Sequence, residues 1–399
     1  MKKNRWILLF SAAAILAAII SLYRYSEGAS ASAAINIFLS VLIVSLPLPL
    51  FLAHRLPLIR GMSRARRTSI NLSGSKALSL LAQADTILLP RCGVVSKGKP
   101  YLTGLIPEGT DSHSLLALAA SIEQSSLHPL GQAICSAAKA RGVQQKIPAA
   151  INEVPSCGVE ALSSRTLMRA GKSSWLQQEG VIIPAELLTK ADQFSQRGQL
   201  PVFVADGKAC RGMLLFDDDL SPENITALRR LHDMGLRLIM ITGCSRRTAS
   251  AVQKKAGLDE FRADLTNEAR LREFQILQAH GATVIVAECR LQRLEAAGLQ
   301  ADLLLKLGDE ELPSPGPSHP ALLAGRSLHD LPQLIRISRR TMKRVRQNRF
   351  FVVIGWMLLL LPAASAILSP AAAFAGQSLL CLLILIHSLR ICLCVIKKQ

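Results

Sequence analysis

Residues 85–100 form a stretch in which a short apolar run is followed at once by a proline, a cation and a thiol. The continuous run Ile87–Leu89 predicts a short buried strand, and Pro90 ends it because proline has no N–H for the sheet ladder. Gly93 then permits a tight loop. Proline offers no nucleophile, so covalent catalysis at Pro90 is excluded, while the fixed charge of Arg91 suits the binding of an anion.

A second turn has the residue types of an anion-binding site. The apolar run 236–242 predicts a buried strand, and Thr242, Gly243 and Cys244 lie where it passes into the next helix. The backbone N–H groups at a helix start attract anions, and the Thr242 hydroxyl lies beside them. This turn therefore has the residue types of a place where an anion is held.

Asp217, Asp218 and Asp219 form a run of carboxylates that could hold a cation. The run also precedes residues 222–234, which have the pattern of a helix that Gly235 ends. Negative charge is favourable before a helix N-terminus. We therefore interpret the run as a solvated loop with helix N-terminal charge rather than as a metal site.

These stretches resemble two motifs of the heavy-metal P-type ATPases. The phosphorylation loop of that family reads Asp-Thr-Val-Val-Phe-Asp-Lys-Thr-Gly-Thr-Leu-Thr-Glu-Gly-Lys-Pro. In register its phosphorylated Asp becomes Pro90, while Gly93 and residues 98–100 are kept. The family's Thr-Gly-Asp turn is matched by Thr242 and Gly243. The resemblance implies catalytic motifs that are degenerate at Pro90, Arg91, Cys92, Cys244, Arg290 and Leu294.

The last two of these positions follow a strand predicted at residues 283–287, where the family has acidic side chains that hold Mg²⁺. Arg290 would repel Mg²⁺, and the family's motif Lys falls on Ala269, with Arg270 one place over. The resemblance implies a weak phosphate site that needs no Mg²⁺ and consists of Arg91, Thr242, Gly243 and Arg290. The alternative is that Arg290 points to solvent and that no ligand binds.

Between these stretches, four partial matches to the family's nucleotide-binding domain occur in the right order. They are Glu123, His128, Gly158 and Gly171. The resemblance implies that His128, which stands in a His-Pro pair, contacts the adenine side of ATP, and that the glycines let the backbone approach the ligand closely. A histidine satisfied at the surface is the alternative. Because Ser156 replaces one family glycine, we expect residual nucleotide binding only.

Four apolar runs predict membrane-spanning helices, each near the roughly 20 residues that a bilayer requires. They cover residues 6–23, 34–53, 350–368 and 377–396. A signal peptide is the alternative for the first run, but the second run follows it directly. Lys and Arg residues flank the runs on the side of both chain ends. The positive-inside rule then places both termini and the large domain in the cytoplasm, at a plasma or inner membrane.

The composition favours a membrane protein over a nucleic-acid binder. The formal net charge is +19, half of the residues are apolar and 4% are aromatic. The positive charge lies beside the apolar runs, and aromatic runs for base stacking are absent, so nucleic acid is not an expected partner. The nine cysteines include no Cys-x-x-Cys pair, which argues against a disulfide framework or a zinc site.

The second apolar run contains Leu46, Pro47 and Leu48, and the proline predicts a break in the helix near mid-membrane. The family carries Cys-Pro-Cys at this place, with thiolates that hold a soft metal. Leucine coordinates nothing, so no metal is expected at Leu46 or Leu48. Cys381 and His387 on the last run lie six residues apart and do not share a helix face well.

The resemblance implies a multi-domain membrane protein. It would have four transmembrane α-helices and a cytoplasmic HAD-like α/β (Rossmann-type) domain with an inserted α+β nucleotide-binding-type domain. The expected parts are a transmembrane hairpin at 1–53, a cytoplasmic connector at 54–84, the HAD-like domain at 85–100 and 201–308, the nucleotide-binding-type domain at 101–200, a linker with a basic amphipathic helix at 309–349, and a second transmembrane hairpin at 350–399. The family's actuator domain would be missing.

The expected function follows from the missing nucleophile, the missing Mg²⁺ ligands and the missing metal ligands in the membrane. We expect a catalytically inactive ATPase-like membrane protein, a pseudoenzyme, which binds a protein partner such as a complete metal transporter or a metal-handling protein. The basic helix 331–346 would contact membrane lipid. No cofactor is certain, weak ATP or phosphate binding is allowed, and Mg²⁺ is not expected. The alternative is half of a split ATP-driven heavy-metal cation transporter that needs an actuator half in trans.

Overall fold

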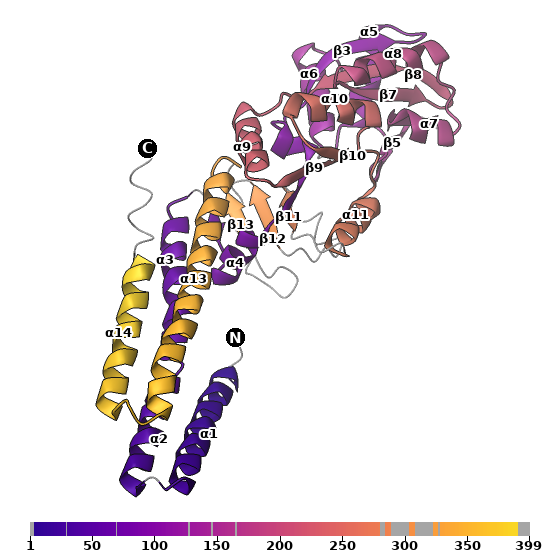
Figure 1. Ribbon diagram of the computed structural model, residues 1–399. Coiled ribbons are helices and arrows are strands. Elements are labelled where there is room, and N and C mark those ends of the chain that lie inside the picture. Colours follow the sequence, from indigo (N-terminus) through magenta and orange to yellow (C-terminus); the bar gives the residue numbers. More distant parts are fainter. Residues whose placement is uncertain are drawn as a thin grey trace. The chain divides into compact units, whose positions relative to one another are not determined.

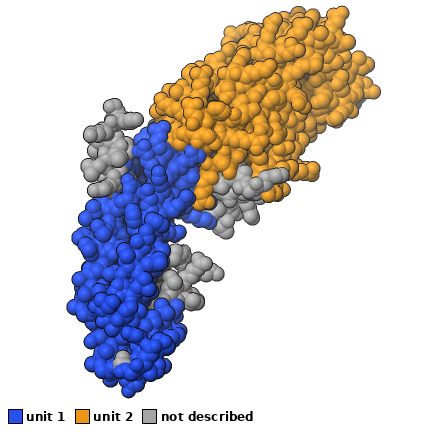
Figure 2. Space-filling view, in the orientation of Figure 1, with its two compact units in different colours: residues 1–68, 74–82, 333–399 blue, residues 69–73, 83–332 orange. Residues whose placement is uncertain are grey.

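The computed structural model describes residues 4–389 except 29, 69, 127, 145–146, 164–165, 280–283, 289–302, 308–321 and 326–327. The chain forms two compact units (Figure 2). Unit 1 consists of residues 1–68, 74–82 and 333–399, and unit 2 of residues 69–73 and 83–332.

Unit 1 is helical (Figure 1). Its helices are α1 (Asn4–Ser26), α2 (Ala31–Ser45), α3 (Leu48–Ala65), α4 (Ser75–Gln83), α13 (Leu331–Ala364) and α14 (Pro370–Leu389). Within the described part, three helical segments are long and apolar enough to cross a membrane: Ala31–Ala65, Leu331–Ala364 and Pro370–Leu389. The first predicted crossing, 6–23, lies in α1, of which the searched part Ala14–Ser26 is a shorter apolar helix.

Three of the predicted helix boundaries differ from the structure. The run predicted at 350–368 is part of α13, which is continuous from Leu331 and ends at Ala364. The run predicted at 34–53 continues as helix to Ala65, with the predicted break at Leu46 and Pro47. The last helix begins at Pro370 rather than at residue 377. Proline is favoured in the first turn of a helix, because the N–H it lacks would have no partner there. The residues before 377 therefore form the first turns of α14.

Glycines allow α13 and α14 to pack closely. A Cβ atom on Gly355 of α13 would lie 2.7 Å from Leu380 Cδ1, and a Cβ atom on Gly376 of α14 would lie 2.6 Å from Leu359 Cδ2. Each helix thus receives a leucine of the other against a glycine. Small residues at such contacts are typical of membrane helices, whose association depends on close packing.

Unit 2 contains a seven-stranded sheet (Figure 1). Its order is β1 (Asn71–Leu72), β13 (Leu322–Gly325), β12 (Leu303–Leu307), β11 (Val284–Glu288), β2 (Thr86–Pro90), β9 (Arg237–Ile241) and β10 (Glu260–Arg262). All neighbours are parallel except β1 and β13. The helices along this part are α9 (Pro222–Asp233), α10 (Arg246–Ala256) and α11 (Asn267–Ala279). Every residue of β2 is buried, as its apolar run predicts.

The second sheet of unit 2 has six strands, all antiparallel. Its order is β3 (Tyr101–Pro107), β8 (Ala209–Asp217), β7 (Leu200–Asp206), β6 (Thr166–Gly171), β5 (Gly158–Ser163) and β4 (Ala150–Val154). The helices are α5 (Ser112–Ile122), α6 (Pro129–Ala140), α7 (Ser173–Gln178) and α8 (Ala185–Gln196). The sequence boundary at residue 201 falls inside β7, and the sheet extends to Asp217.

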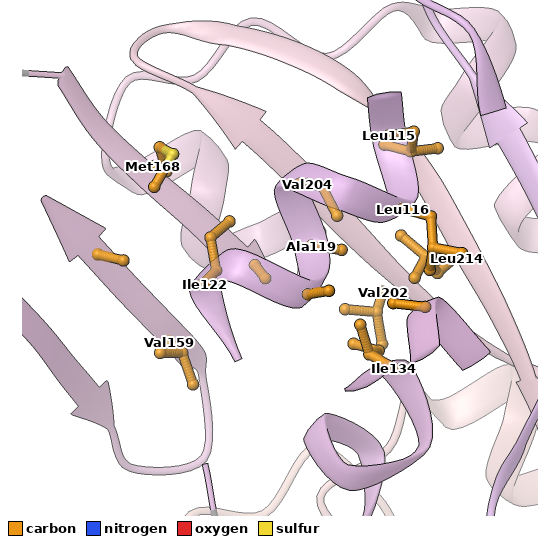
Figure 3. Close-up of a cluster of buried hydrophobic side chains, with 14 of the residues drawn as sticks. Leu115, Leu116, Ala119, Ile122, Ile134, Val159, Met168, Val202, Val204 and Leu214 are labelled. Carbon is orange, nitrogen blue, oxygen red and sulfur yellow. The ribbon is translucent and has the colours of Figure 1, made fainter. Parts of the chain in front are cut away.

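Alternation along β7 and β8 explains why both strands belong to this sheet. Val202 and Val204 face the apolar cluster formed with α5 and α6 (Figure 3), whereas Phe203 and Ala205 face the cluster formed with α7 and α8. Successive strand residues point to opposite faces, so strands covered on both faces are apolar throughout. Such a run does not reveal from sequence which sheet it will join.

Candidate functional site

The carboxyl ends of β2 and β9 position the candidate site. The two strands are parallel neighbours, and Pro90 at the end of β2 is paired with Ile241 at the end of β9. The chain therefore leaves both strands at the same edge of the sheet, which is where open α/β sheets place their ligands. The turns Arg91–Val95 and 242–245 consequently lie next to each other.

The turn Arg91–Val95 is closed by its own backbone. The N–H of Ser96 donates to the carbonyl of Arg91 at 2.9 Å. Gly93 has a φ of +81°, in the left-handed region that glycine enters without steric penalty. The Cβ position of Gly98 lies 2.9 Å from the Cα of Gly93, so the two arms of the loop pass in close contact. The predicted end of the strand at Pro90 and the predicted tight loop are confirmed.

Arg91 turns its side chain into the protein. Its side chain is among the largest that are fully buried, with 2% of the residue exposed. Nη1 donates to Cys244 Sγ at 3.2 Å, and Nε is buried without a partner. Burial disfavours the charged form, but the nearby thiols of Cys244 and Cys92 and the Asp218 carboxylate outweigh it and raise the Arg91 pKa. A guanidinium is always charged in proteins, so a full positive charge lies at the end of β2.

Two thiols flank this guanidinium. Burial by surrounding protein atoms is the main reason that the pKa of Cys92 is raised to about 11, although the residue keeps exposed surface. A thiol with that pKa is protonated at neutral pH and is a poor nucleophile. Cys244 lies at the opposite turn and accepts the hydrogen bond of Arg91.

Thr242 keeps a hydroxyl proton available at this edge. Its Oγ1 accepts from the N–H of Cys244 at 3.2 Å, and Thr242 is 4% exposed. The first turn of α10 has a cap of its own, because Ser245 Oγ accepts from the N–H of Thr248. A hydroxyl that accepts one hydrogen bond can still donate another, so the Thr242 hydroxyl can donate to an acceptor at this edge of the sheet.

Two further cations meet at Gly243. The Cβ position of Gly243 lies 3.6 Å from Nη2 of Arg270 and 3.9 Å from Nζ of Lys172. Nε of Arg270 is buried without a partner. The sequence signal for Arg270 is its place beside Ala269, where the related motif has Lys. The sequence around Lys172 does not indicate this role. Lys172 follows β6 of the second sheet and comes close to Gly243 only in the folded protein.

Asp218 is a buried carboxylate near Arg91. It is 5% exposed, its Oδ2 accepts from Ser96 Oγ at 2.5 Å, and its Oδ1 is buried without a partner. Asp219 is exposed and accepts from Lys97 and Tyr101. The carboxylate run is therefore a solvated loop at Asp219 but not at Asp218, whose burial against Ser96 the sequence did not reveal.

The remaining degenerate positions, Arg290 and Leu294, lie outside the described residues. The strand that leads toward them, β11, is described and pairs with β2 on the side opposite β9. Among the described residues, Arg91 lies at Cys244, and Arg270 and Lys172 lie near Gly243.

Glu123 and His128, the first two predicted nucleotide contacts, lie around the turn between α5 and α6. His128 caps α6, because its Nδ1 accepts from the N–H of Leu130 at 3.2 Å. Its backbone N–H donates to Ser126 Oγ. Glu123 is 6% exposed, and burial is the main cause that raises its pKa to about 7. The His128 side chain thus caps a helix, and the Glu123 side chain is packed in the protein interior.

Gly158 and Gly171, the other two predicted contacts, face each other across β5 and β6. A Cβ atom on Gly158 would lie 2.8 Å from Trp175 Cζ3, and one on Gly171 would lie 2.9 Å from Trp175 Cε3. The indole of Trp175 packs where these side chains would be. The structure therefore supplies a packing reason for both glycines, next to the ligand approach that the sequence indicated.

The break between α2 and α3 is occupied by protein groups. Nε2 of Gln377 donates to the carbonyl of Leu46 at 3.0 Å, while its Oε1 and the Nε1 of Trp356 are buried without partners. Leu46 and Leu48 flank Pro47 at this break. The described residues include no group of three or more His, Cys, Asp or Glu side chains that could hold a metal.

His387 takes part in a polar cluster rather than in a pair with Cys381. Its Nε2 lies 2.6 Å from Arg344 Nη1, and its Nδ1 lies 2.6 Å from Asn348 Oδ1. Asn348 Nδ2 in turn donates to Ser388 Oγ. Both ring nitrogens of His387 are therefore engaged with α13.

A comparison with known protein families assigns most of unit 2 to a family. The model of the haloacid dehalogenase-like hydrolases matches residues 92–297. The chain belongs to the haloacid dehalogenase-like hydrolase family. The match begins directly after Pro90 and Arg91 and includes the turn at Thr242 and the strands of both sheets from β3 to β11.

The curated relatives that this chain resembles include copper-transporting P-type ATPases. A copper-transporting P-type ATPase of Rhizobium leguminosarum bv. viciae is 31% identical over 364 residues, which cover 88% of this chain and 42% of the relative. A copper-exporting P-type ATPase of Bacillus subtilis (strain 168) is 30% identical and is matched over 46% of its length. The chain spans less than half the length of these relatives and corresponds to their C-terminal part.

Solved structures share the fold. A zinc-transporting PIB-type ATPase in an E2·Pi state aligns with a TM-score of 0.64 at 22% identity, over 97% of this chain and 62% of that one. The catalytic domain of the CPx-ATPase CopB-B aligns with a TM-score of 0.53 at 19% identity, over 70% of this chain. These likenesses confirm the predicted fold of a HAD-like domain with an inserted nucleotide-binding-type domain. Of the four predicted membrane crossings, three coincide with described helices that are long and apolar enough to span a membrane.

Proposed function

We propose that this chain is a non-catalytic member of the heavy-metal P-type ATPases, which acts by binding a protein partner in metal transport or homeostasis. The observation that carries the proposal is the end of β2. Phosphoryl transfer through an enzyme intermediate requires a nucleophile, and this strand ends in Pro90. The adjoining side chain, Arg91, is buried against Cys244 and carries the charge opposite to that of a carboxylate.

A phosphorylation assay tests this proposal. The purified full chain is incubated with γ-labelled ATP and Mg²⁺, with and without copper or zinc ions, and is quenched in acid. We expect no acid-stable, hydroxylamine-sensitive label, because Pro90 cannot form an acyl phosphate. A complete copper-transporting ATPase serves as the positive control. Label on this chain at a substantial fraction of the control level would refute the proposal.

The proposed partner contacts include membrane lipid. The segment of α13 that precedes its apolar part carries exposed basic residues, which are Arg336, Arg340, Lys343 and Arg346. Their positive charge supports contact with anionic headgroups. For the protein partner, affinity purification of the tagged chain from native membranes should retain a defined protein at near-stoichiometric amount. Recovery of the chain alone, under conditions that preserve known membrane complexes, would contradict this part of the proposal.

The alternative function is one half of a split ATP-driven heavy-metal transporter. It is favoured by the retained framework, since the large sheet still brings the turns after β2 and β9 together. It requires an actuator half in trans and a nucleophile in this half. Acyl-phosphate formation that depends on a co-expressed partner would favour this alternative over the non-catalytic function.

A further inference from the structure

We propose that Cys244 is a modification site, at which a hydroperoxide oxidises the thiolate to a sulfenate that Arg91 holds. The inference goes beyond the proposed function, because it requires neither a phosphoenzyme nor a protein partner. Cys244 stands where the family's Thr-Gly-Asp turn has its Asp. The proposed chemistry is therefore particular to this chain and is not a step of the family's catalysis.

Cys244 lies on a fixed turn at the edge of the large sheet. Its carbonyl accepts from the N–H of Asp264 at 2.9 Å, and its own N–H donates to Thr242 Oγ1 at 3.2 Å. The next residue, Ser245, is the N-cap of α10. Cys244 is partly exposed. The backbone contacts thus hold the residue in place while a small oxidant has access to the turn.

A buried guanidinium is directed at this sulfur. Nη1 of Arg91 donates to Cys244 Sγ at 3.2 Å, and Arg91 is only 2% exposed. Salt in the solvent screens a buried interaction of this kind only weakly. Reactive thiolates in proteins occur in partly exposed places beside Arg, Lys or protonated His. The direct contact of Arg91 with Cys244 has this arrangement.

An unused donor on Arg91 is an independent sign that an acceptor is missing. Its Nε is buried and has no hydrogen-bond partner among the described residues. A buried N–H without an acceptor costs free energy, and the sulfur already receives the hydrogen bond from Nη1. A sulfenate adds one oxygen to the sulfur, next to the same guanidinium. That oxygen is an anionic acceptor, to which a guanidinium forms a strong hydrogen bond.

Cys92, the other thiol at this edge, provides the contrast. Burial by protein atoms is the main cause that raises its pKa to about 11. At pH 7.5 its thiolate fraction is therefore about two orders of magnitude below that of an ordinary cysteine. The residue nevertheless has more exposed surface than Cys244. If exposure alone controlled oxidation, Cys92 would react first; if the guanidinium contact controls it, Cys244 reacts first.

The step balances without a metal or a cofactor. The Cys244 thiolate attacks the distal oxygen of the hydroperoxide, so that an S–O bond forms and the O–O bond breaks. The electron pair of the broken bond leaves on the alkoxide, or on hydroxide if the oxidant is hydrogen peroxide. This leaving group takes the proton of the transferred hydroxyl, which gives a sulfenate and an alcohol or water. The sulfur loses two electrons and the peroxide gains two. A sulfenate is the reversible first stage of cysteine oxidation, and two equivalents of a thiol restore the cysteine.

Competitive trapping on the purified full chain tests the site. The reduced protein in detergent at pH 7.5 is treated with hydrogen peroxide in the presence of dimedone, which traps sulfenates, and each cysteine-containing peptide is quantified by mass spectrometry. We expect Cys244 to be labelled about tenfold faster than Cys157, which is also partly exposed, and Cys92 to stay unlabelled. Labelling of Cys92 or Cys157 as fast as Cys244, or no label on Cys244, would overturn the proposal.

Variants of Arg91 separate its charge from its packing. Arg91→Met removes the contact and should slow the labelling of Cys244 about tenfold, whereas Arg91→Lys keeps a positive charge and should keep the rate within about threefold of the parent. Arg246→Gln is the control, because this exposed arginine lies two residues from Cys244 and its loss changes the net charge equally. It should leave the rate unchanged. Equal slowing in all three variants would show that the Arg91 contact does not activate Cys244, and the proposal would be wrong.

Circular dichroism establishes that each variant is folded before its rate is compared. If Arg91→Met does not fold, the ranking of Cys244, Cys157 and Cys92 in the parent protein supports or overturns the proposal without it. A failure of this site leaves the non-catalytic function intact, because that function is judged by acyl-phosphate formation. Acyl-phosphate formation, in turn, leaves the trapping result for Cys244 unchanged, so the two outcomes are distinguishable.

Discussion

Glu123 is a single residue whose ionisation changes stability in a predictable direction. Burial raises its pKa to about 7, well above the ordinary value of a glutamate, so the folded protein disfavours the charged form. Stability is unaffected below the unfolded pKa, falls as the pH rises toward 7, and stays lower above it. We expect Glu123→Gln to be more stable than the parent at pH 8 by about 2–3 kcal/mol and nearly equal to it at pH 4.

Thermal unfolding of the full chain at pH 4, 6 and 8 measures this difference. Glu108→Gln is the control, since Glu108 is exposed in the same part of unit 2 and should give the same pH dependence as the parent. A Glu123→Gln difference that does not grow between pH 4 and pH 8 would show that the carboxylate is ionised at little cost.

At the scale of elements, the contact between α13 and α14 depends on its two glycines. Gly355 leaves less than 3 Å between a would-be Cβ and Leu380, so a branched side chain there forces the helices apart. We expect Gly355→Leu to lower the free energy of unfolding by about 1–3 kcal/mol, as overpacking does. Unfolding in detergent, followed by circular dichroism, measures the change. Val353→Leu, at a position that is 52% exposed on the same helix, should have little effect.

For the whole molecule, the charge pattern predicts on which side of the membrane each turn lies. The basic residues that flank the apolar runs predict cytoplasmic termini, which puts the turn between α1 and α2 outside. Ser30→Cys should therefore react with a membrane-impermeant maleimide in intact cells. Arg336→Cys should react only after permeabilisation; both positions are exposed, and the parent protein gives the background of native cysteines. The reverse pattern of labelling would contradict the orientation.

The sequence by itself determined the features that local chemistry controls. Apolar runs made α2, α13 and α14, because a helix of that length and composition needs no distant partner to be recognised. A continuous apolar run forms β2, Pro90 ends the strand, and Gly93 allows the tight loop that follows. The effects of proline and glycine act on the backbone of the residue itself, so they can be predicted from sequence. The family motifs around these turns are likewise contiguous in the chain, so the fold was predictable from them.

Tertiary structure alone decided which side chains share a site. Lys172 meets Arg270 at Gly243 only because the second sheet folds back toward the edge of the first, and Gln377 meets the Leu46 carbonyl only because α14 packs beside the break. The membership of β7 and β8 in the second sheet was decided in the same way, by hydrogen bonds to β3 and β6. Sequence spacing carries periodicity and backbone preference, whereas electrostatic convergence and strand pairing depend on distances that exist only once the chain has folded.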